Sequence, residues 1–123
     1  SENVEELIGL AKVGMAFALG GMGSATTNFY NSAYSRAGFE DAARTVQRLW
    51  VEGDKDAAIA AVPDELVLAA YPIGTEPMVR DRIRAYRQAG VTTLRLGPNG
   101  STPAEVIENL EYAVDLIGSS TAD

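Results

Sequence analysis

The turn at residues 97–102 carries the groups best suited to bind an anion. Its sequence is Gly-Pro-Asn-Gly-Ser-Thr, and it directly precedes a run whose periodicity predicts a helix. Glycines let a ligand approach the backbone closely, and the free N–H groups at a helix start attract phosphate. We therefore expect Gly97, Gly100, Ser101 and Thr102 to bind the phosphate of a cofactor. The alternative is a well-capped connection between two elements.

Arg95 lies two residues before this turn, between Leu94 and Leu96. A guanidinium at the end of a buried strand can hold a carboxylate or phosphate through two parallel hydrogen bonds. It can equally pair with an acid on a neighbouring strand, because a buried charge needs a partner. Arg95 is thus a candidate substrate-binding residue, with a structural ion pair as the alternative.

The sequence lacks the residue types that most often carry catalysis. It contains no His and no Cys, which removes the commonest general base, the commonest metal ligand and any thiolate nucleophile. Asp54, Asp56, Asp64 and Glu65 stand at expected helix starts, where capping and the helix dipole explain them. We expect no metal site and assign no catalytic residue in this chain.

Two other motifs are better explained by structure than by ligand binding. The run Gly20-Gly21-Met22-Gly23 lacks the Lys-Ser/Thr ending of a phosphate-binding loop and follows a helix, so a turn between helices is expected. Four arginines alternate with other residues along one predicted helix, which indicates a solvated face. They are Arg80, Arg82, Arg84 and Arg87.

Composition excludes several classes of partner. The formal net charge is −7 and the pI is near 4.5, which argues against nucleic acid and against an anionic membrane surface. No apolar run approaches the length of about 18 residues that spans a bilayer, and no secretory signal is visible. We expect a cytoplasmic protein that binds neither membrane nor nucleic acid.

Apolar periodicity, capping residues and glycines predict the elements that position these groups. Helices are expected at residues 2–19, 28–34, 39–52, 55–61, 64–70, 76–89 and 103–117. Val91–Leu96 predicts a strand, since residues on both of its faces are apolar or β-branched, as in a buried parallel strand. Residues 72–74 are extended or a very short strand. The chain is therefore expected to be mainly helical, with one to three short strands.

The two C-terminal helices have distinct apolar stripes. Val79, Ile83 and Tyr86 are expected to point inward from the first. The second begins with the capping box Thr102-Pro103-Ala104-Glu105 and ends at Gly118. Its expected stripe consists of Val106, Leu110, Ala113, Val114 and Ile117.

Several short motifs follow one another in a specific order along nearly the whole chain. They lie at residues 20–23, 28–30, 38–41, 46–50, 53–57, 62–67, 73–75 and 82–94. In this order and spacing they resemble the luciferase-like flavin-dependent monooxygenase family, and within it the deazaflavin (coenzyme F420) dependent oxidoreductases. One departure is Thr75-Glu76-Pro77, where the family more often has Thr-Pro-Glu; proline falls in the first helical turn in both cases.

The resemblance implies an α/β fold, a (β/α)8 TIM barrel with a helical insertion before its last unit. Such a barrel needs roughly 250 residues, so this chain would be its C-terminal part. Residues 1–72 would form the helical insertion region and residues 73–118 the last βαβα units. Residues 119–123 would be a frayed tail.

The resemblance also implies a function. The chain would be a C-terminal fragment of a flavin- or deazaflavin-dependent oxidoreductase that uses coenzyme F420 or FMN on a small-molecule substrate. Asn28 and Phe29 would line the substrate pocket, although aromatic residues at this spacing also suit a core. The fragment is expected to be inactive alone, to bind no cofactor and to form a homo-oligomer. The alternatives are a non-enzymatic helical interaction module and a small-anion binding domain.

Overall fold

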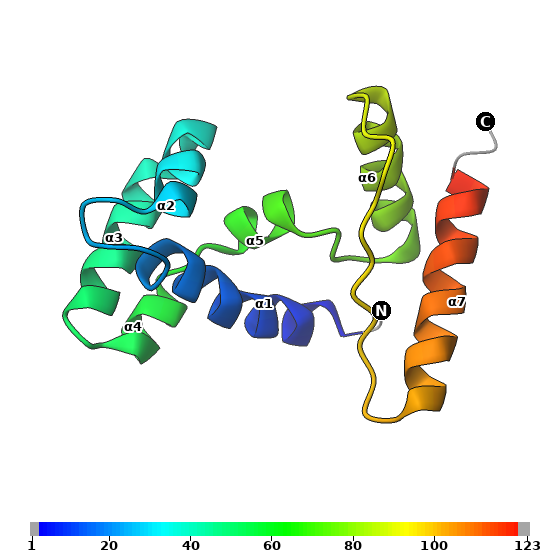
Figure 1. The fold of residues 1–123 in the computed structure, drawn as a ribbon, viewed down its shortest axis with the longest axis horizontal. Coiled ribbons are helices and arrows are strands. Elements are labelled where there is room, and N and C mark those ends of the chain that lie inside the picture. Colours follow the sequence, from blue (N-terminus) through cyan, green and yellow to red (C-terminus); the bar gives the residue numbers. More distant parts are fainter. Residues whose placement is uncertain (1–2, 121–123) are drawn as a thin grey trace. The chain divides into compact units, whose positions relative to one another are not determined.

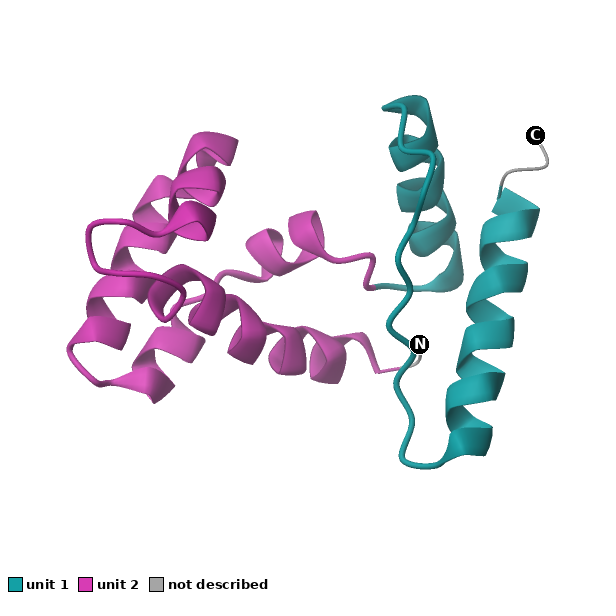
Figure 2. Ribbon diagram, viewed as in Figure 1, with its two compact units in different colours: residues 1, 74–123 teal, residues 2–73 magenta. Residues whose placement is uncertain are grey.

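The computed structural model describes residues 3–120 of the chain. It divides into two compact units, residues 2–73 and residues 74–123 (Figure 2). The expected tail at residues 119–123 lies partly outside the described residues, since residues 121–123 are not among them. Each unit is built differently, and each is described by itself.

Five α-helices make up the first unit (Figure 1). They are α1 (Val4–Gly20), α2 (Phe29–Tyr34), α3 (Glu40–Val51), α4 (Lys55–Ala60) and α5 (Asp64–Ala70), with the π-helical turn η1 (Ser35–Phe39) between α2 and α3. All five helices were predicted from the sequence, with ends that differ by one or two residues. Gly38 interrupts the helical path before α3 with a φ of 102°, a conformation that favours glycine.

The core of this unit is apolar and closes without a strand. Its largest fully buried side chains come from α1, α3, α5 and the turn before α5. They are Met15, Leu19, Val46, Val62, Leu66 and Val67. Removing this apolar surface from water is the main favourable term for the unit.

Two asparagines connect the end of α1 to α2 and α3. The Asn28 amide nitrogen donates to the carbonyl oxygens of Ala18 and Leu19 at 3.0 Å each, and its oxygen accepts from the backbone N–H of Asn31 at 3.1 Å. The Asn31 amide nitrogen donates to the carbonyls of Leu19 at 3.1 Å and Ala43 at 2.8 Å. The last carbonyls of a helix have no partner inside the helix, so these amides satisfy groups that packing would otherwise leave unpaired.

The second unit contains two long helices joined by an extended segment. The helices are α6 (Glu76–Gln88) and α7 (Pro103–Ser120). As predicted, Val79, Ile83 and Tyr86 are among the least exposed side chains of α6.

Two predictions about α7 were wrong in detail. The helix continues through Gly118 to Ser120, because a glycine in a helix ends it only where the backbone turns away. Its most buried apolar side chain is Leu116, whereas Val114, placed in the predicted stripe, is exposed. Of the other predicted stripe residues, Val106, Ala113 and Ile117 are half-buried and Leu110 is exposed.

The predicted strand at Val91–Leu96 was wrong. Residues 91–100 are extended, but no strand occurs anywhere in residues 3–120, so the one to three short strands, including any at residues 72–74, are absent from the described chain. A strand exists only where its N–H and C=O groups pair with a neighbour, and no second extended segment is available here. The expectation of a mainly helical chain was right.

The hydrogen bonds of Asn31 to α1 and α3 give a prediction about stability. Replacing Asn31 with alanine removes both donors and leaves the Ala43 carbonyl without that partner, so the first unit should lose about 1–3 kcal/mol of unfolding free energy. Urea unfolding followed by the fluorescence of Trp50, the single tryptophan, measures the loss. Asn99→Ala is the matched control, because the Asn99 side chain makes no hydrogen bond within residues 3–120. Equal stability of the two variants would contradict the role of Asn31.

Candidate functional site

Among the described residues, the extended segment between α6 and α7 has the most backbone N–H groups that donate no hydrogen bond. The Val91 N–H donates to the Tyr86 carbonyl at 3.0 Å and so closes the end of α6. From residue 92 to residue 100, no backbone N–H donates a hydrogen bond within the described part of the chain. Val91, Leu94 and Leu96 are 42%, 37% and 37% exposed. The segment therefore has open backbone edges together with exposed apolar side chains.

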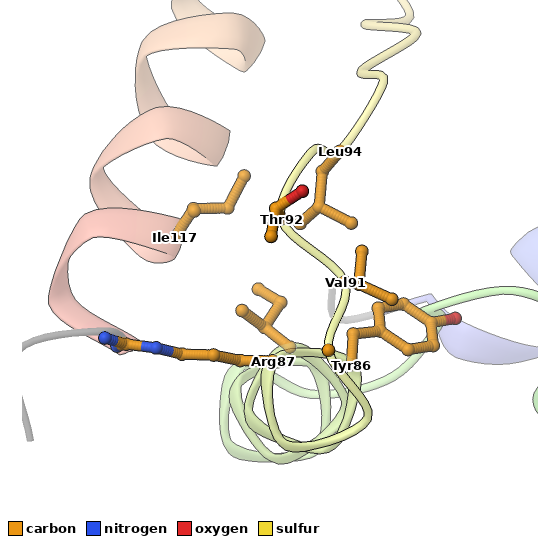
Figure 3. A pocket seen from close by; sticks show the side chains of 8 residues that line it. Tyr86, Arg87, Val91, Thr92, Leu94 and Ile117 are labelled. Atoms are coloured by element: carbon orange, nitrogen blue, oxygen red, sulfur yellow. The ribbon is translucent and has the colours of Figure 1, made fainter.

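A hollow of about 470 Å³ lies beside this segment. Figure 3 shows Thr92 and Leu94 from the segment, Ile117 from α7, and Tyr86 and Arg87 from the end of α6 around it. The remaining lining residues are Ile83, Gly90 and Val91. Most of the lining is apolar, Arg87 is its one charged side chain, and Tyr86 and Thr92 add hydroxyl groups. The hollow can receive apolar side chains or an apolar ligand, and no carboxylate lines it.

The turn that leads into α7 is held by the predicted capping box. Thr102 Oγ1 accepts from the Glu105 N–H at 3.3 Å, and the Glu105 carboxylate accepts from the Ser101 N–H at 2.7 Å. Gly100 lies close to the helix, since a Cβ there would approach the Val106 nitrogen to 2.7 Å. A Cβ on Gly97 would meet nothing within 4 Å. The turn thus already binds one anionic oxygen, which belongs to Glu105 in the first turn of α7.

The structure brings four of the predicted site residues together, because Gly97, Gly100, Ser101 and Thr102 all belong to this turn. Arg95 is in the extended segment of the same unit, is exposed, and has no ion pair within residues 3–120. The structural ion pair considered for it is therefore not formed here.

Asn28 and Phe29 belong to the helical unit. The side chain of Asn28 is buried and fully engaged with α1 and α2, which favours a structural task. Phe29 is 74% exposed, so it is not a core residue. It contacts Tyr30 edge-on, with ring centroids 5.7 Å apart. Of the two, only Phe29 presents its side chain to a possible ligand.

The glycine run at residues 20–23 allows other parts of the chain to pack closely against its backbone. A Cβ on Gly20 would lie 2.4 Å from the Cβ of Trp50, and a Cβ on Gly23 would lie 2.3 Å from the Thr27 carbonyl oxygen. Gly23 also has a φ of 99°. These contacts support the interpretation as a turn between helices.

The acidic and basic residues singled out from the sequence have structural roles as well. Asp54 accepts from the Ala57 N–H at 3.1 Å and caps α4. Asp64 pairs with Lys12 at 2.5 Å. In the arginine cluster, Arg84 pairs with Asp81 at 3.1 Å.

A polar network between α6 and α7 was not found from the sequence. Glu76 accepts from Arg80 Nη2 at 2.7 Å and from the Tyr112 hydroxyl at 3.2 Å. Arg80 also donates to the Ser119 hydroxyl at 2.5 Å. The pairing of Glu76 with Arg80 follows from their spacing of four residues, whereas Tyr112 and Ser119 join only because the two helices lie side by side in this unit.

This network shifts two pKa values. Hydrogen bonds from Arg80 and then from Tyr112 lower the pKa of Glu76 below its ordinary value. Desolvation, followed by the hydrogen bond to Glu76, raises the pKa of Tyr112. Glu76 is therefore a carboxylate and Tyr112 a neutral phenol at neutral pH. The network fixes the two helices and contains no group poised to exchange a proton near pH 7.

Tyr112→Phe tests this network. Losing the phenol donor should move the pKa of Glu76 up toward its ordinary value, as measured by NMR titration of its side chain. Because the folded pKa is lowered, the stability that Glu76 contributes is present above its unfolded pKa and is lost as pH falls through the folded pKa. The variant should therefore lose less stability as the pH falls, and that loss should be complete at a higher pH than in the parent chain. Tyr86→Phe is the control, and an unchanged Glu76 titration in Tyr112→Phe would refute the hydrogen bond.

None of the helices in residues 3–120 is long and apolar enough to cross a membrane. No solved structure matches the chain. One curated relative is a protein of Mycobacterium tuberculosis that is named as a coenzyme F420-dependent oxidoreductase. It is 38% identical over 80 residues, which make up 65% of this chain and 23% of the relative. The aligned part is thus about a quarter of that relative's length.

The sequence profile of luciferase-like monooxygenases matches residues 1–93. That range includes all of the helical unit, helix α6 and the start of the extended segment. This match confirms the resemblance found in the short motifs, and the chain belongs to the luciferase-like monooxygenase family.

Proposed function

We propose that this chain is the C-terminal part of a flavin- or deazaflavin-dependent oxidoreductase built on a (β/α)8 barrel. The observation that carries the proposal is the extended segment at residues 91–100, because none of its backbone N–H groups after Val91 has an acceptor within the described chain. In a family member, such a segment between two amphipathic helices has the form of a barrel strand with its flanking helices. Family membership and the short aligned share of the relative support this assignment.

In this proposal, residues 91–96 become a strand when strands from the remainder of the barrel lie on both sides. Pairing would supply acceptors for the open N–H groups and would cover Val91, Leu94 and Leu96. Residues 1–72 are the helical insertion region. The groups that react with substrate would come from the remainder of the barrel, because no carboxylate lines the hollow beside residues 91–94.

The turn at residues 97–102 would hold the cofactor phosphate. The Ser101 N–H donates to an oxygen of the Glu105 carboxylate at 2.7 Å, and this contact with an anionic oxygen supports the proposal. A phosphate has to displace that carboxylate, and the start of α7 would favour its charge. The cofactor, coenzyme F420 or FMN, would supply hydride transfer or reaction with oxygen.

The small-molecule substrate would contact residues of this chain at two places. Arg95 is exposed and has no ion pair in residues 3–120, so its guanidinium is available for an acidic group on a ligand. Phe29 is available for an apolar or aromatic group. Asn28 stays in the proposal as the residue that caps α2, the helix that begins at Phe29.

A second candidate is a non-enzymatic helical interaction module. The favouring observation is that residues 2–73 close an apolar core of their own. This candidate accounts for the helical unit, but it gives no role to the open backbone of residues 92–100.

The coding sequence upstream of Ser1 and a cofactor titration test the proposal together. Six further βα units are expected upstream. The longer polypeptide should bind FMN or coenzyme F420, measured by cofactor fluorescence, whereas the 123-residue chain should not reach sub-micromolar affinity. Tight binding by the short chain would show that it is a self-sufficient cofactor domain. A native start codon directly before Ser1 would favour the helical module.

Self-association of the chain gives a further prediction. The open edges of residues 92–100 invite pairing with another chain, so we expect a dimer or larger assembly of the 13.0 kDa chain in sedimentation at micromolar concentration. Leu94→Glu should weaken it by placing a charge in the segment. Leu10→Glu, an exposed apolar position in the other unit, should not. A parent chain that is monomeric would favour the non-enzymatic helical interaction module over the barrel assignment.

A further inference from the structure

The pair Asn99–Gly100 is set up for a chemical change that the proposed function does not involve. Both residues are exposed and lie outside any helix. Within the described residues, neither the Asn99 side chain nor the Gly100 N–H makes a hydrogen bond. We propose that Asn99 is a site of spontaneous deamidation, which converts its amide to a carboxylate in the folded protein.

The reaction needs only water. The Gly100 backbone nitrogen attacks the side-chain carbonyl carbon of Asn99, a C–N bond closes a five-membered imide, and ammonia leaves with the proton lost by Gly100. Water then opens the imide at one of its two carbonyls. One opening gives aspartate, and the other gives isoaspartate, in which the main chain continues through the former side chain. A glycine after the asparagine favours the attack, because it has no side chain to hinder its nitrogen.

Three other asparagines, Asn28, Asn31 and Asn109, are protected by their surroundings, which makes them internal controls. Asn31 precedes the small residue Ser32, but it lies in α2 and its amide donates to two backbone carbonyls. Asn28 is buried with its amide engaged. Asn109 lies inside α7 and is followed by a leucine. In a helix, the backbone nitrogen that would attack is held away from the side-chain carbonyl.

Asn109 also controls how readily Asn99 reacts. Its amide nitrogen donates to the backbone carbonyl of Asn99 at 2.5 Å. This contact restricts rotation about the bond that must turn to bring the Gly100 nitrogen onto the side chain. Asn109 is therefore a restraint on the reaction, and its removal should speed the conversion.

The two products should affect the fold differently. Aspartate at residue 99 places a negative charge just before α7, where the helix dipole favours it. Isoaspartate lengthens the main chain next to Gly100, which has no spare room because a Cβ there would approach the Val106 nitrogen to 2.7 Å. The turn should then separate from the first turn of α7. A further consequence rests on the proposed function: either carboxylate would repel a phosphate held at residues 97–102.

Mass spectrometry of the intact 123-residue chain tests the inference. After incubation for days at mildly alkaline pH, digestion should give two isomeric peptides in which Asn99 has exchanged its NH2 for OH. Asn28 and Asn31 should keep their amides. The Asn109→Ala variant should convert several-fold faster, and Asn99→Gln should stay unchanged, because its longer side chain would have to close a larger ring.

The outcome that overturns the inference is retention of the Asn99 amide while the same chain, unfolded in urea, converts over the same time. That result would mean that the folded turn holds residues 99 and 100 apart. A conversion rate that is equal in Asn109→Ala and the parent chain would remove the restraint assigned to Asn109. Neither readout depends on cofactor binding, so failure here is distinguishable from failure of the proposed function.

Discussion

Backbone hydrogen bonding is the constraint on which the rest of this structure depends. Each residue other than proline brings one N–H donor and one C=O acceptor that must find partners when they leave water. In the helical unit this requirement is met at the end of α1, where the Asn28 and Asn31 amides reach the last carbonyls of the helix. In the other unit, the donors of residues 92–100 have no partner within the described chain. In the first unit, side-chain amides therefore supply the missing hydrogen bonds at the end of α1. In the second unit, one segment keeps its backbone N–H groups without partners in the described chain.

The two units also differ in which polar groups are available to bind a ligand. Most polar residues that suggested chemistry in the sequence are engaged in holding the fold. Asn28 secures the end of α1, Asp54 caps α4, and Asp64 pairs with Lys12. The groups that remain available are the open segment, Arg95 within it and the turn before α7. All of these backbone and polar groups belong to residues 74–123, whereas the exposed ring of Phe29 belongs to the helical unit.

Much of the fold could be predicted from the sequence because its signals are local. Helix starts such as Asp54 and Thr102 depend on a side chain that accepts from a backbone N–H three residues later, and the apolar spacing of α1 depends on one helical period. The network of Glu76, Arg80, Tyr112 and Ser119 was missed, because its hydrogen bonds between helices join residues 36 and 39 positions apart in the chain. No local pattern in α7 marks Tyr112 as a partner of Glu76.

The sequence by itself determined the helices, the caps at Asp54 and Thr102, the turn before α7 and, through the order of short motifs, the family. The tertiary structure alone decided two matters. The first is the state of residues 91–96, since a β-branched run forms a strand only when a neighbouring strand accepts its hydrogen bonds. The second is the task of each polar side chain: the sequence shows an asparagine at residue 28, whereas only packing places its amide against the end of α1. Helix and strand propensity depends on residues close together in the sequence. Strand pairing and side-chain burial depend on which distant segments lie next to each other in the folded chain.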